Sequence, residues 1–214
     1  MMEITRFIFN PFQVNSFILI NNNECILIDC AAYTEDEFNK VLHYLKHKNV
    51  KPKAIMSTHG HIDHICGNNS FIREYDIPFY MNKDDIFLVE GAKHYASAFG
   101  IAIESPPLPD FELFDGMHYE LGGELIQIIH VPGHSPGSMA FYCEKDAFVI
   151  TGDALFAGSI GRTDLPQGNH EQLLNSIKKQ LFILPQHTAV FPGHGPDTSI
   201  GAEIRENPFL KISY

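Results

Sequence analysis

Four side chains able to bind a metal ion lie within the six positions 59–64, in the segment THGHIDH. His59, His61, Asp63 and His64 combine imidazole nitrogens with one carboxylate, a donor set that suits zinc, iron or manganese. Gly60 leaves room for the backbone to turn, and in an extended chain positions 59, 61 and 63 point to the same side. Four donors this close together cannot all bind one ion without strain. We therefore expect them to be shared between two neighbouring ions.

Three later motifs each place one more metal-binding side chain after an apolar run. His134 lies in VPGHSPGS, Asp153 ends VITGD, and His194 lies in VFPGHG. Proline and glycine exclude helix from the two histidine loops and hold their side chains at strand ends. A carboxylate directly after a buried strand is unfavourable unless a cation meets it. The three motifs therefore predict that the metal site lies at the carboxyl ends of buried strands.

The strands that would position these residues are visible as short apolar runs. The runs are rich in Ile, Val, Phe and Tyr and end at Gly, Pro, Asn or Asp. They cover residues 7–10, 16–20, 25–30, 54–58, 77–81, 125–131, 139–143, 147–153 and 189–193. The proline-rich acidic segment 103–116 is expected to be a surface connection between two of them.

Helical patterns alternate with these strands. Thr34 and Glu37 have capping-box spacing at the start of a helix over 34–49, and Asn169 is the expected N-cap of a helix over 169–184. Further helices are expected over 82–98 and 198–206. Strand pairs mixed with crossover helices predict an α/β protein in which helices cover the sheets.

The composition sets limits on the class of protein. The 214 residues, 44% apolar and 19% charged, predict one compact domain over 1–214. A formal net charge of -11 argues against nucleic acid or anionic membrane as a partner. The four cysteines form no CxxC pair, and no apolar run has the length of a signal sequence or membrane span. We therefore expect a soluble cytoplasmic protein.

The motifs THGHIDH, GHSPGS, TGD and PGHG, in this order, resemble those of the metallo-β-lactamase-fold superfamily and span most of the chain. The resemblance implies a four-layered αββα sandwich, with two mixed β-sheets flanked by helices and the site at one edge between the sheets. It also implies two divalent ions, with zinc expected and iron or manganese as alternatives. The implied ligands are His59, His61 and His134 for one ion, Asp63, His64 and His194 for the other, and Asp153 as a bridge.

The segment FAGSIGRTDLPQGN and the ending ENPFL resemble the single-domain branch of glyoxalase II-like hydrolases. Longer glyoxalase II enzymes carry an added C-terminal helical domain that contacts glutathione. We expect no such domain here, because the chain stops at Tyr214, soon after its last motif. The resemblance therefore implies the hydrolytic chemistry without implying the glutathione contacts of that domain.

The resemblance implies a metal-dependent hydrolase that cleaves a small-molecule thioester of the S-acylglutathione type. A hydroxide bridging the two ions would attack the acyl carbonyl, and Asp63 is the candidate catalytic residue because it would orient that hydroxide. Arg162 and Asp164, in the GRTD segment, are candidates for contacting substrate. Asp164 could instead accept a hydrogen bond from a ligand histidine, and a plain ion pair between the two residues is the alternative.

Two other functions compete with this one. Persulfide dioxygenases of the same fold share the GRTD-type segment and use a single iron held by counterparts of His59, His134 and Asp153. The chain keeps the ligands of both metals, as many dioxygenases do, but GSIGRTDLPQGN is closer to the hydrolases. A purely structural zinc module is disfavoured because such sites are closed and rich in thiolates. Cys66 and Tyr95 are expected to be packing residues, with lining of a pocket as the alternative for Tyr95, and the remaining histidines to be solvated or capping.

Overall fold

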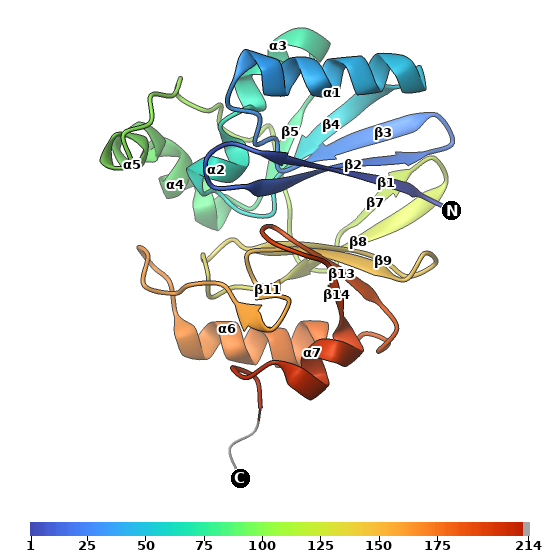
Figure 1. The fold of residues 1–214 in the computed structure, drawn as a ribbon, viewed down its shortest axis with the longest axis vertical. Coiled ribbons are helices and arrows are strands. Elements are labelled where there is room, and N and C mark those ends of the chain that lie inside the picture. Colours follow the sequence, from blue (N-terminus) through green and yellow to red (C-terminus); the bar gives the residue numbers. More distant parts are fainter. Residues whose placement is uncertain (212–214) are drawn as a thin grey trace.

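Two six-stranded β-sheets pack face to face in this computed structural model, which describes residues 1–211 (Figure 1). In spatial order, the first sheet contains β1 (Glu3–Phe9), β2 (Val14–Asn21), β3 (Glu24–Ile28), β4 (Lys51–Met56), β5 (Phe79–Met81) and β6 (Phe111–Glu112). The second contains β14 (Thr198–Ser199), β13 (Ala189–Pro192), β10 (Phe148–Gly152), β9 (Met139–Cys143), β8 (Glu124–His130) and β7 (His118–Leu121). Each sheet combines parallel with antiparallel pairs, so both are mixed.

Helices cover the outer face of each sheet. The helices are α1 (Glu35–Lys48), α2 (Ile62–Ile65), α3 (Asn68–Tyr75), α4 (Ile86–Glu90), α5 (Ala92–Ala98), α6 (His170–Ser176) and α7 (Ile200–Glu206). Figure 1 shows α1 and α3 above the first sheet, α6 and α7 below the second, and α2, α4 and α5 at one end of the first. This arrangement confirms the four-layered αββα sandwich of the metallo-β-lactamase fold.

Three apolar clusters fill the three interfaces between the four layers, because successive strand residues face opposite sides of a sheet. In β3, Ile26 and Ile28 point into the cluster between the two sheets. Their neighbours Cys25 and Leu27 point instead into the cluster that contains Leu45 of α1. The third cluster joins the outer face of the second sheet to α6 and the turn that follows it. Strand alternation alone therefore distributes the apolar residues among the layers.

The expected start signals of two helices are confirmed. Thr34 and Glu37 form a capping box at the start of α1, and the side chain of Asn169 accepts a hydrogen bond at the start of α6. The helix expected over 169–184 is shorter and not wholly α-helical. Its α-helical part, α6, stops at Ser176, and a π-helical turn, Ile177–Leu181, follows directly.

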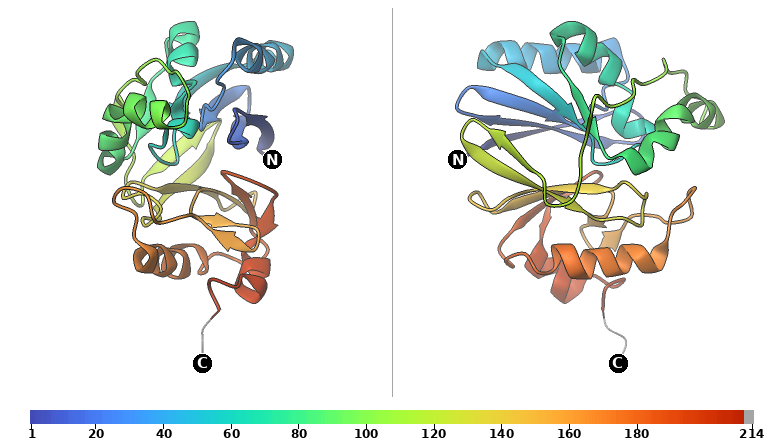
Figure 2. Two further views of the ribbon diagram at one scale, coloured as in Figure 1. Left: turned by 60° about the vertical axis from the view of Figure 1, so that its left-hand side comes forward. Right: turned by 180° about the vertical axis from the view of Figure 1, so that it is seen from behind.

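The middle of the chain differs from its sequence-based prediction. The single helix expected over 82–98 is a 3-10 turn, Lys83–Asp85, followed by α4 and α5, which meet at Gly91. Glycine is a poor helix former, and here it ends one helix and caps the next. Segment 103–116, expected to be a plain connection, contributes edge strand β6, and the chain then passes to the second sheet (Figure 2). Within residues 1–211, no helix is both long and apolar enough to cross a membrane.

Candidate metal centre

The loops that follow β4, β8, β10 and β13 meet at one edge of the sandwich, next to α2. In doubly layered mixed sheets, the carboxyl ends of the strands are where such sites form. These loops and α2 bring all of the predicted ligands together: His59, His61, Asp63, His64, His134, Asp153 and His194. Residues separated by more than a hundred positions in the sequence thus meet in one cluster.

The cluster divides into two trios that share a carboxylate. Ligand atoms within each of the groups His59–His61–His134 and Asp63–His64–His194 lie within 4.8 Å of one another. This grouping is the one that the family resemblance implies. A third group, His59–His64–Asp153, meets the same criterion and connects the two trios.

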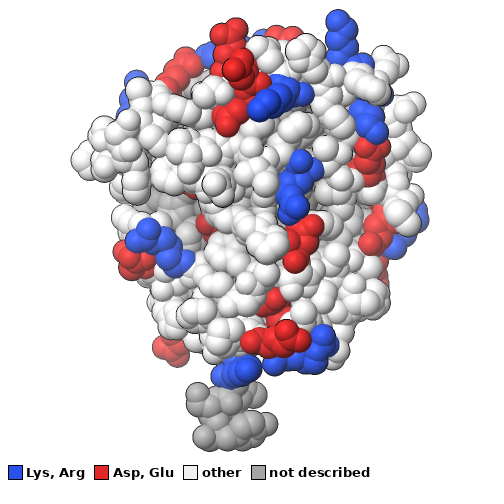
Figure 3. All heavy atoms as spheres, in the orientation of Figure 1, with Lys and Arg blue, Asp and Glu red and all other residues white. Residues whose placement is uncertain are grey.

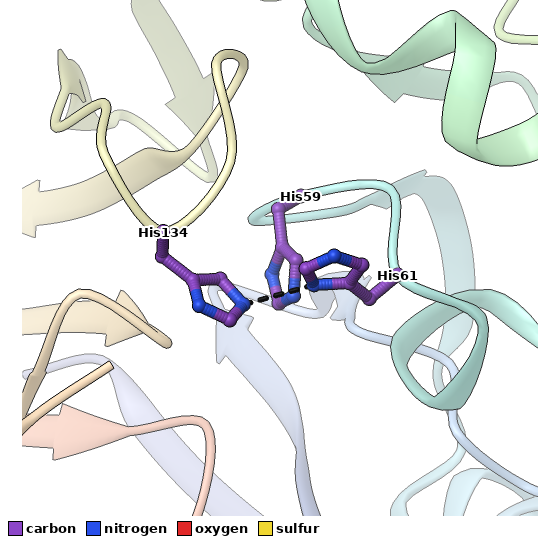
Figure 4. A group of neighbouring side chains, drawn as sticks. All are labelled: His59, His61 and His134. Carbon is purple, nitrogen blue, oxygen red and sulfur yellow. Dashed lines mark hydrogen bonds between the residues drawn. The ribbon is translucent and has the colours of Figure 1, made fainter. Parts of the chain in front are cut away.

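Figure 4 shows how the first trio converges, with the rings of His59 and His61 coming from one loop and that of His134 from another. The Nδ1 atom of His61 lies 2.9 Å from the Nε2 atom of His134. The rings of His59 and His61 are nearly perpendicular, with centroids 4.8 Å apart. The nitrogens of the three side chains therefore face a common point.

Asp153 lies between the trios. Its Oδ2 atom is 3.7 Å from Nε2 of His134, in the first trio, and 3.4 Å from Nε2 of His194, in the second. Its Oδ1 atom is 3.4 Å from Nε2 of His64. A carboxylate in this place could serve as a ligand to ions held by both trios. The position is the one expected of a bridging ligand.

Asp63 is not in the extended conformation that its spacing suggested. His61 is the N-cap of α2, and Asp63 lies in the single turn of that helix. The turn directs Asp63 and His64 together toward the second trio, with Oδ2 of Asp63 3.5 Å from Nε2 of His194. A helical turn, and not strand alternation, therefore separates these two residues from His59 and His61.

Hydrogen bonds on the outer side of four rings select the nitrogen that faces inward. Nδ1 of His134 donates to the carbonyl oxygen of Arg162 at 2.7 Å, and Nδ1 of His194 donates to that of Phe12 at 3.0 Å. A ring that donates from Nδ1 keeps the lone pair of Nε2 free, and such partners are usual for metal-binding histidines. His64 and His59 follow the same rule through a buried carboxylate, Asp29.

Asp29 directly follows β3 and is fully buried. Its Oδ2 atom accepts hydrogen bonds from Nδ1 of His64 at 3.0 Å and from Oγ1 of Thr58 at 2.8 Å. Oγ1 of Thr58 in turn lies 3.0 Å from Nδ1 of His59. Sequence reasoning missed Asp29, although the signal was present, because CILIDC places a carboxylate directly after an apolar strand just as VITGD does.

Asp85 is a second buried carboxylate that sequence reasoning missed. It accepts hydrogen bonds from the backbone N–H of Gly60 at 2.9 Å, from Oγ of Ser135 at 2.7 Å and from the N–H of Gly137 at 2.7 Å. Burial raises the pKa of this carboxyl, although the three hydrogen bonds act in the opposite direction. Asp85 therefore ties the loop that carries His59 to the loop that carries His134.

Asn15, near the start of β2, holds the loop after β13, which carries His194. Its backbone N–H donates to the carbonyl of Gly193 at 2.7 Å, and its side-chain amide donates to those of Pro192 and Gly195. These bonds connect the first sheet to the loop of His194 on the second. No local pattern marked Asn15, because its partners lie at the other end of the chain.

The site fits divalent metal ions. Nε2 of His59 and Oδ1 of Asp153 are buried side-chain atoms without a hydrogen-bond partner among the described residues. Unpaired buried polar atoms are costly, and a cation would satisfy them. Imidazole and carboxylate donors without thiolate suit zinc, iron or manganese. The backbone at Gly193 lies close against the Asp153 carboxylate, because a Cβ atom at this glycine would lie 2.3 Å from Oδ1 of Asp153.

The pKa values of histidines in the two trios shift in opposite directions. Burial lowers the pKa of His59 well below its usual value and that of His61 to about 3, with neighbouring histidines adding to the effect. Burial also disfavours the charged forms of His64 and His194, but nearby carboxylates outweigh it and raise their pKa values to about 9 and about 10. In the metal-free protein, His59 and His61 are therefore neutral at pH 7, while the histidines of the second trio hold protons that an incoming ion must displace.

Arg162 and Asp164 form an ion pair, the simplest of the arrangements expected for them. The guanidinium donates to both carboxylate oxygens, each at 2.7 Å, and both side chains are exposed. The expectation that the Asp164 carboxylate accepts from a ligand histidine is wrong, because His134 donates to the Arg162 carbonyl instead. The GRTD segment thus supports the metal site through its backbone.

The cluster opens into a cavity of about 460 Å³, the size of many small-molecule sites. The ligand candidates His61, Asp63, His134, Asp153 and His194 line its floor. Tyr95, expected to be a packing residue, lines this cavity instead. On the face shown in Figure 3, the Lys and Arg residues are scattered among Asp and Glu and form no continuous basic surface.

Cys66 and His130, which is one of the remaining histidines, lie outside the cluster. Cys66 packs with its Sγ atom 3.4 Å from the Ala31 carbonyl, and burial raises the pKa of its thiol to about 12, so it is a poor nucleophile. His130 donates from Nε2 to the Pro136 carbonyl at 2.8 Å.

Comparisons with known proteins agree with this geometry. "Probable metallo-hydrolase YqgX" of Bacillus subtilis is 38% identical over 98% of this chain and 98% of its own. "Hydroxyacylglutathione hydrolase GloC" of Haemophilus influenzae is 34% identical over 93% of each chain. The crystal structure of TTHA1623 in a di-iron-bound form matches with a TM-score of 0.87 and 41% identity, over 96% of this chain and 100% of that one.

The structure of ETHE1 from Myxococcus xanthus has a TM-score of 0.78 at 23% identity, over 97% of this chain and 84% of that one, and shares the fold. The profile of the Metallo-beta-lactamase superfamily matches residues 9–194, from the end of β1 to the last ligand candidate. That range contains the first three motifs, the fourth as far as His194, and both trios. The chain therefore belongs to the Metallo-beta-lactamase superfamily.

Proposed function

We propose that this protein is a metal-dependent hydrolase of thioesters, of the glyoxalase II type, with S-acylglutathione-type compounds as substrates. The observation that carries the proposal is the pair of ligand trios, joined by Asp153 and opening into a cavity of small-molecule size. The 34% identity with a hydroxyacylglutathione hydrolase along 93% of the chain supports the thioester class.

Two divalent ions in the trios would activate a water molecule as nucleophile and polarise the acyl carbonyl. The residues around them would position the reactants. Asp63 lies at the floor of the cavity, and the charge of His64 and the hydrogen bond from His194 lower its pKa, although burial acts in the opposite direction. Its ionised carboxylate can accept a hydrogen bond from the attacking water and orient it.

The proposed reaction does not need a general acid to protonate the leaving group, because that group is a thiolate. A thiol has a pKa of about 8.5, so it can depart as thiolate without being protonated first. An amide or β-lactam nitrogen must gain a proton as it leaves. Apart from ligand candidates, the described cavity-lining side chains that carry a donatable proton are Tyr95, Ser159 and Arg162, whose hydroxyl and guanidinium groups are weak acids. The site is therefore better suited to thioesters than to β-lactams.

Arg162 is the proposed contact for the thiol carrier. Its side chain lines the cavity and is exposed, with Asp164 as its present partner. A surface ion pair of this kind contributes little stability, so a substrate carboxylate can compete for the guanidinium. A glutathione carboxylate would fit this exchange. Arg162→Ala is then expected to raise KM for a glutathione thioester and leave kcat nearly unchanged.

The test combines metal analysis with hydrolysis of S-D-lactoylglutathione and S-acetylglutathione. Anaerobically purified protein is expected to hold two ions per chain and to release thiol from at least one of these esters. Exhaustive chelation should abolish that release, and added metal should restore it. His64→Ala should lose it, whereas His118→Ala, at an exposed histidine of β7, should not.

One result would favour the alternative, a mononuclear iron persulfide dioxygenase. That enzyme would need only one iron, held by His59, His134 and Asp153, and would consume oxygen with glutathione persulfide. One iron per chain, rapid oxygen uptake and no thiol release from any ester would overturn the hydrolase proposal. Hydrolysis of a β-lactam such as nitrocefin at a higher kcat/KM than any thioester would overturn the choice of substrate class.

A further inference from the structure

We infer that the acyl group of the substrate is apolar, and that one wall of the cavity binds it. This inference rests on the proposed thioester hydrolysis and identifies the acyl class that the site selects. It predicts hydrocarbon or aromatic acyl groups in preference to a small hydroxylated group such as lactoyl.

The wall is formed by residues of the first half of the chain. We call it the helical wall, and it consists of Phe12, Ile62, Leu88, Tyr95 and Phe99. Ile62 and Leu88 are only 8% and 2% exposed, so they are firmly packed. Phe12 and Phe99 meet edge to face with ring centroids 5.5 Å apart at the rim. None of the five side chains carries a charge, and the Tyr95 hydroxyl is the only polar group among them.

The helical wall starts directly at the metal centre. Ile62 lies between His61 and Asp63, one residue from a member of each trio. A carbonyl placed at the ligand candidates would therefore have Ile62 as an immediate neighbour, and its acyl chain could continue along Leu88 toward Tyr95. A chain running in this direction meets hydrocarbon from its first carbon atoms onward.

The part of the lining that residues 156–166 contribute differs in its charge. It includes Phe156, Ile160 and Leu165, together with Arg162, the one Lys or Arg that lines the cavity among the described residues. A thiol carrier such as glutathione has carboxylates and needs a cation, whereas an acyl chain needs none. The distribution of charge therefore places the carrier on the side of Arg162 and the acyl group against the helical wall.

Burial of hydrocarbon gives the expected size of the preference. Each methylene removed from water stabilises a complex about fourfold, equivalent to about 0.8 kcal/mol. A hydroxyl group moved to the same place must give up hydrogen bonds to water, and only the Tyr95 phenol could replace them. A lactoyl group would therefore gain less from this wall than a butanoyl or hexanoyl group.

The experiment keeps the thiol constant and varies the acyl group. Metal-loaded protein is assayed with the S-acetyl, S-butanoyl, S-hexanoyl, S-phenylacetyl and S-D-lactoyl thioesters of glutathione. We expect kcat/KM to rise about two- to fourfold per methylene from acetyl to hexanoyl, and to be at least tenfold higher for hexanoyl than for lactoyl. A flat series, or a preference for lactoyl, would overturn the inference and leave the thioesterase proposal standing. Failure of every ester would instead overturn the thioesterase proposal.

Single substitutions test whether the helical wall causes the preference for apolar acyl groups. Phe99→Ala, at a side chain 57% exposed, should lower kcat/KM about three- to tenfold for hexanoyl and hardly change it for acetyl. The matched control is Phe111→Ala, at an aromatic side chain 53% exposed on β6 and outside the cavity. Tyr95→Phe should keep the apolar preference, so a shift of the order of preference in this variant would assign selectivity to the hydroxyl instead.

A binding measurement separates the acyl wall from the reaction. S-hexylglutathione and S-methylglutathione are thioethers that cannot be hydrolysed. Calorimetry should show the hexyl compound binding at least tenfold more tightly, with the difference reduced in Phe99→Ala and retained in Phe111→Ala. Equal affinities for the two thioethers would contradict the inference independently of any activity.

Discussion

Nδ1 of His64 donates to Oδ2 of Asp29 over 3.0 Å, and neither side chain is accessible to solvent. Through Thr58 the same carboxylate also supports His59, so it orients one ligand candidate in each trio. Asp29 has a backbone φ of 54°, in the left-handed region that costs a non-glycine residue free energy. The surrounding hydrogen bonds hold it in this conformation.

Replacement of Asp29 should therefore weaken both metal positions. Removing the carboxylate that fixes a ligand histidine lowers metal affinity roughly 10- to 100-fold in other proteins. We expect Asp29→Ala to reach this range for both ions, as measured by competition with a chelator of known affinity. Asp76→Ala is the matched control, because Asp76 has a φ of 53° but caps α3 on the surface. Equal losses in the two variants would assign the effect to backbone strain.

Asp85→Asn should affect the two trios unequally. Each carboxylate oxygen accepts one backbone N–H, Oδ2 from Gly60 and Oδ1 from Gly137, and the new amide NH₂ could not accept either bond in the place of the oxygen that it replaces. Leaving a buried donor unpaired costs about 1–3 kcal/mol. Because Asp85 bonds to Gly60 and Gly137, in the loops of the first trio, metal content should fall from two ions toward one. Asp84→Asn, at the exposed neighbour, should retain both ions, and full occupancy in Asp85→Asn would refute this role.

Metal binding should release protons and strengthen as the pH rises. His64 and His194, with pKa values raised to about 9 and about 10, are protonated at pH 7 in the metal-free protein. Filling the second trio should then release up to two protons, which calorimetry in buffers of different ionisation enthalpy measures directly. Binding enthalpies that do not depend on the buffer would contradict this prediction.

The stability of the metal-free protein should vary with pH in the opposite direction. A raised folded-state pKa stabilises the fold fully below the unfolded pKa of about 6.5, and this contribution is lost as the pH rises through the folded pKa. The stabilisation from protonated His64 and His194 should therefore decrease as the pH rises from about 6.5 to about 10, and the chelated protein should become progressively less stable over that range. Urea unfolding at several pH values tests this, and a stability that rises through this window would contradict it.

Gly193→Ala should disturb the bridging position. A Cβ atom there would lie 2.3 Å from Oδ1 of Asp153 and 2.9 Å from Cε1 of His64, so one of them must move. We expect metal affinity to fall at least tenfold in chelator competition. Gly195→Ala is the control, because its Cβ would meet nothing within 4 Å, although its φ of +75° should cost about 1–2 kcal/mol of stability. Wild-type affinity in Gly193→Ala would show that the carboxylate does not need this space.

Sequence motifs identified the seven candidates that the structure brings together, and the family resemblance that these motifs carry implied the sandwich. The seven candidates could be found because each belongs to a short motif with chemically distinctive residues after an apolar run. The same local character made the start of α1 predictable, since the capping box of Thr34 and Glu37 spans only four residues. Asp63 shows the limit of this reasoning, because spacing alone favoured an extended chain where the structure has a helical turn.

Tertiary structure alone decided what holds the cluster in place. Asp29, Asp85 and Asn15 act through partners that lie up to 180 positions away. The run CILIDC could have marked Asp29 itself, but no local pattern reports which residues these three bind. The acceptor for His134 is a backbone carbonyl of Arg162, which any residue type at that position would supply. The nitrogen that each ring presents and the charge of each wall follow from how the two sheets pack. Ligand identity is a property of side chains, whereas ligand orientation depends on long-range hydrogen bonds that exist only once the sheets have met.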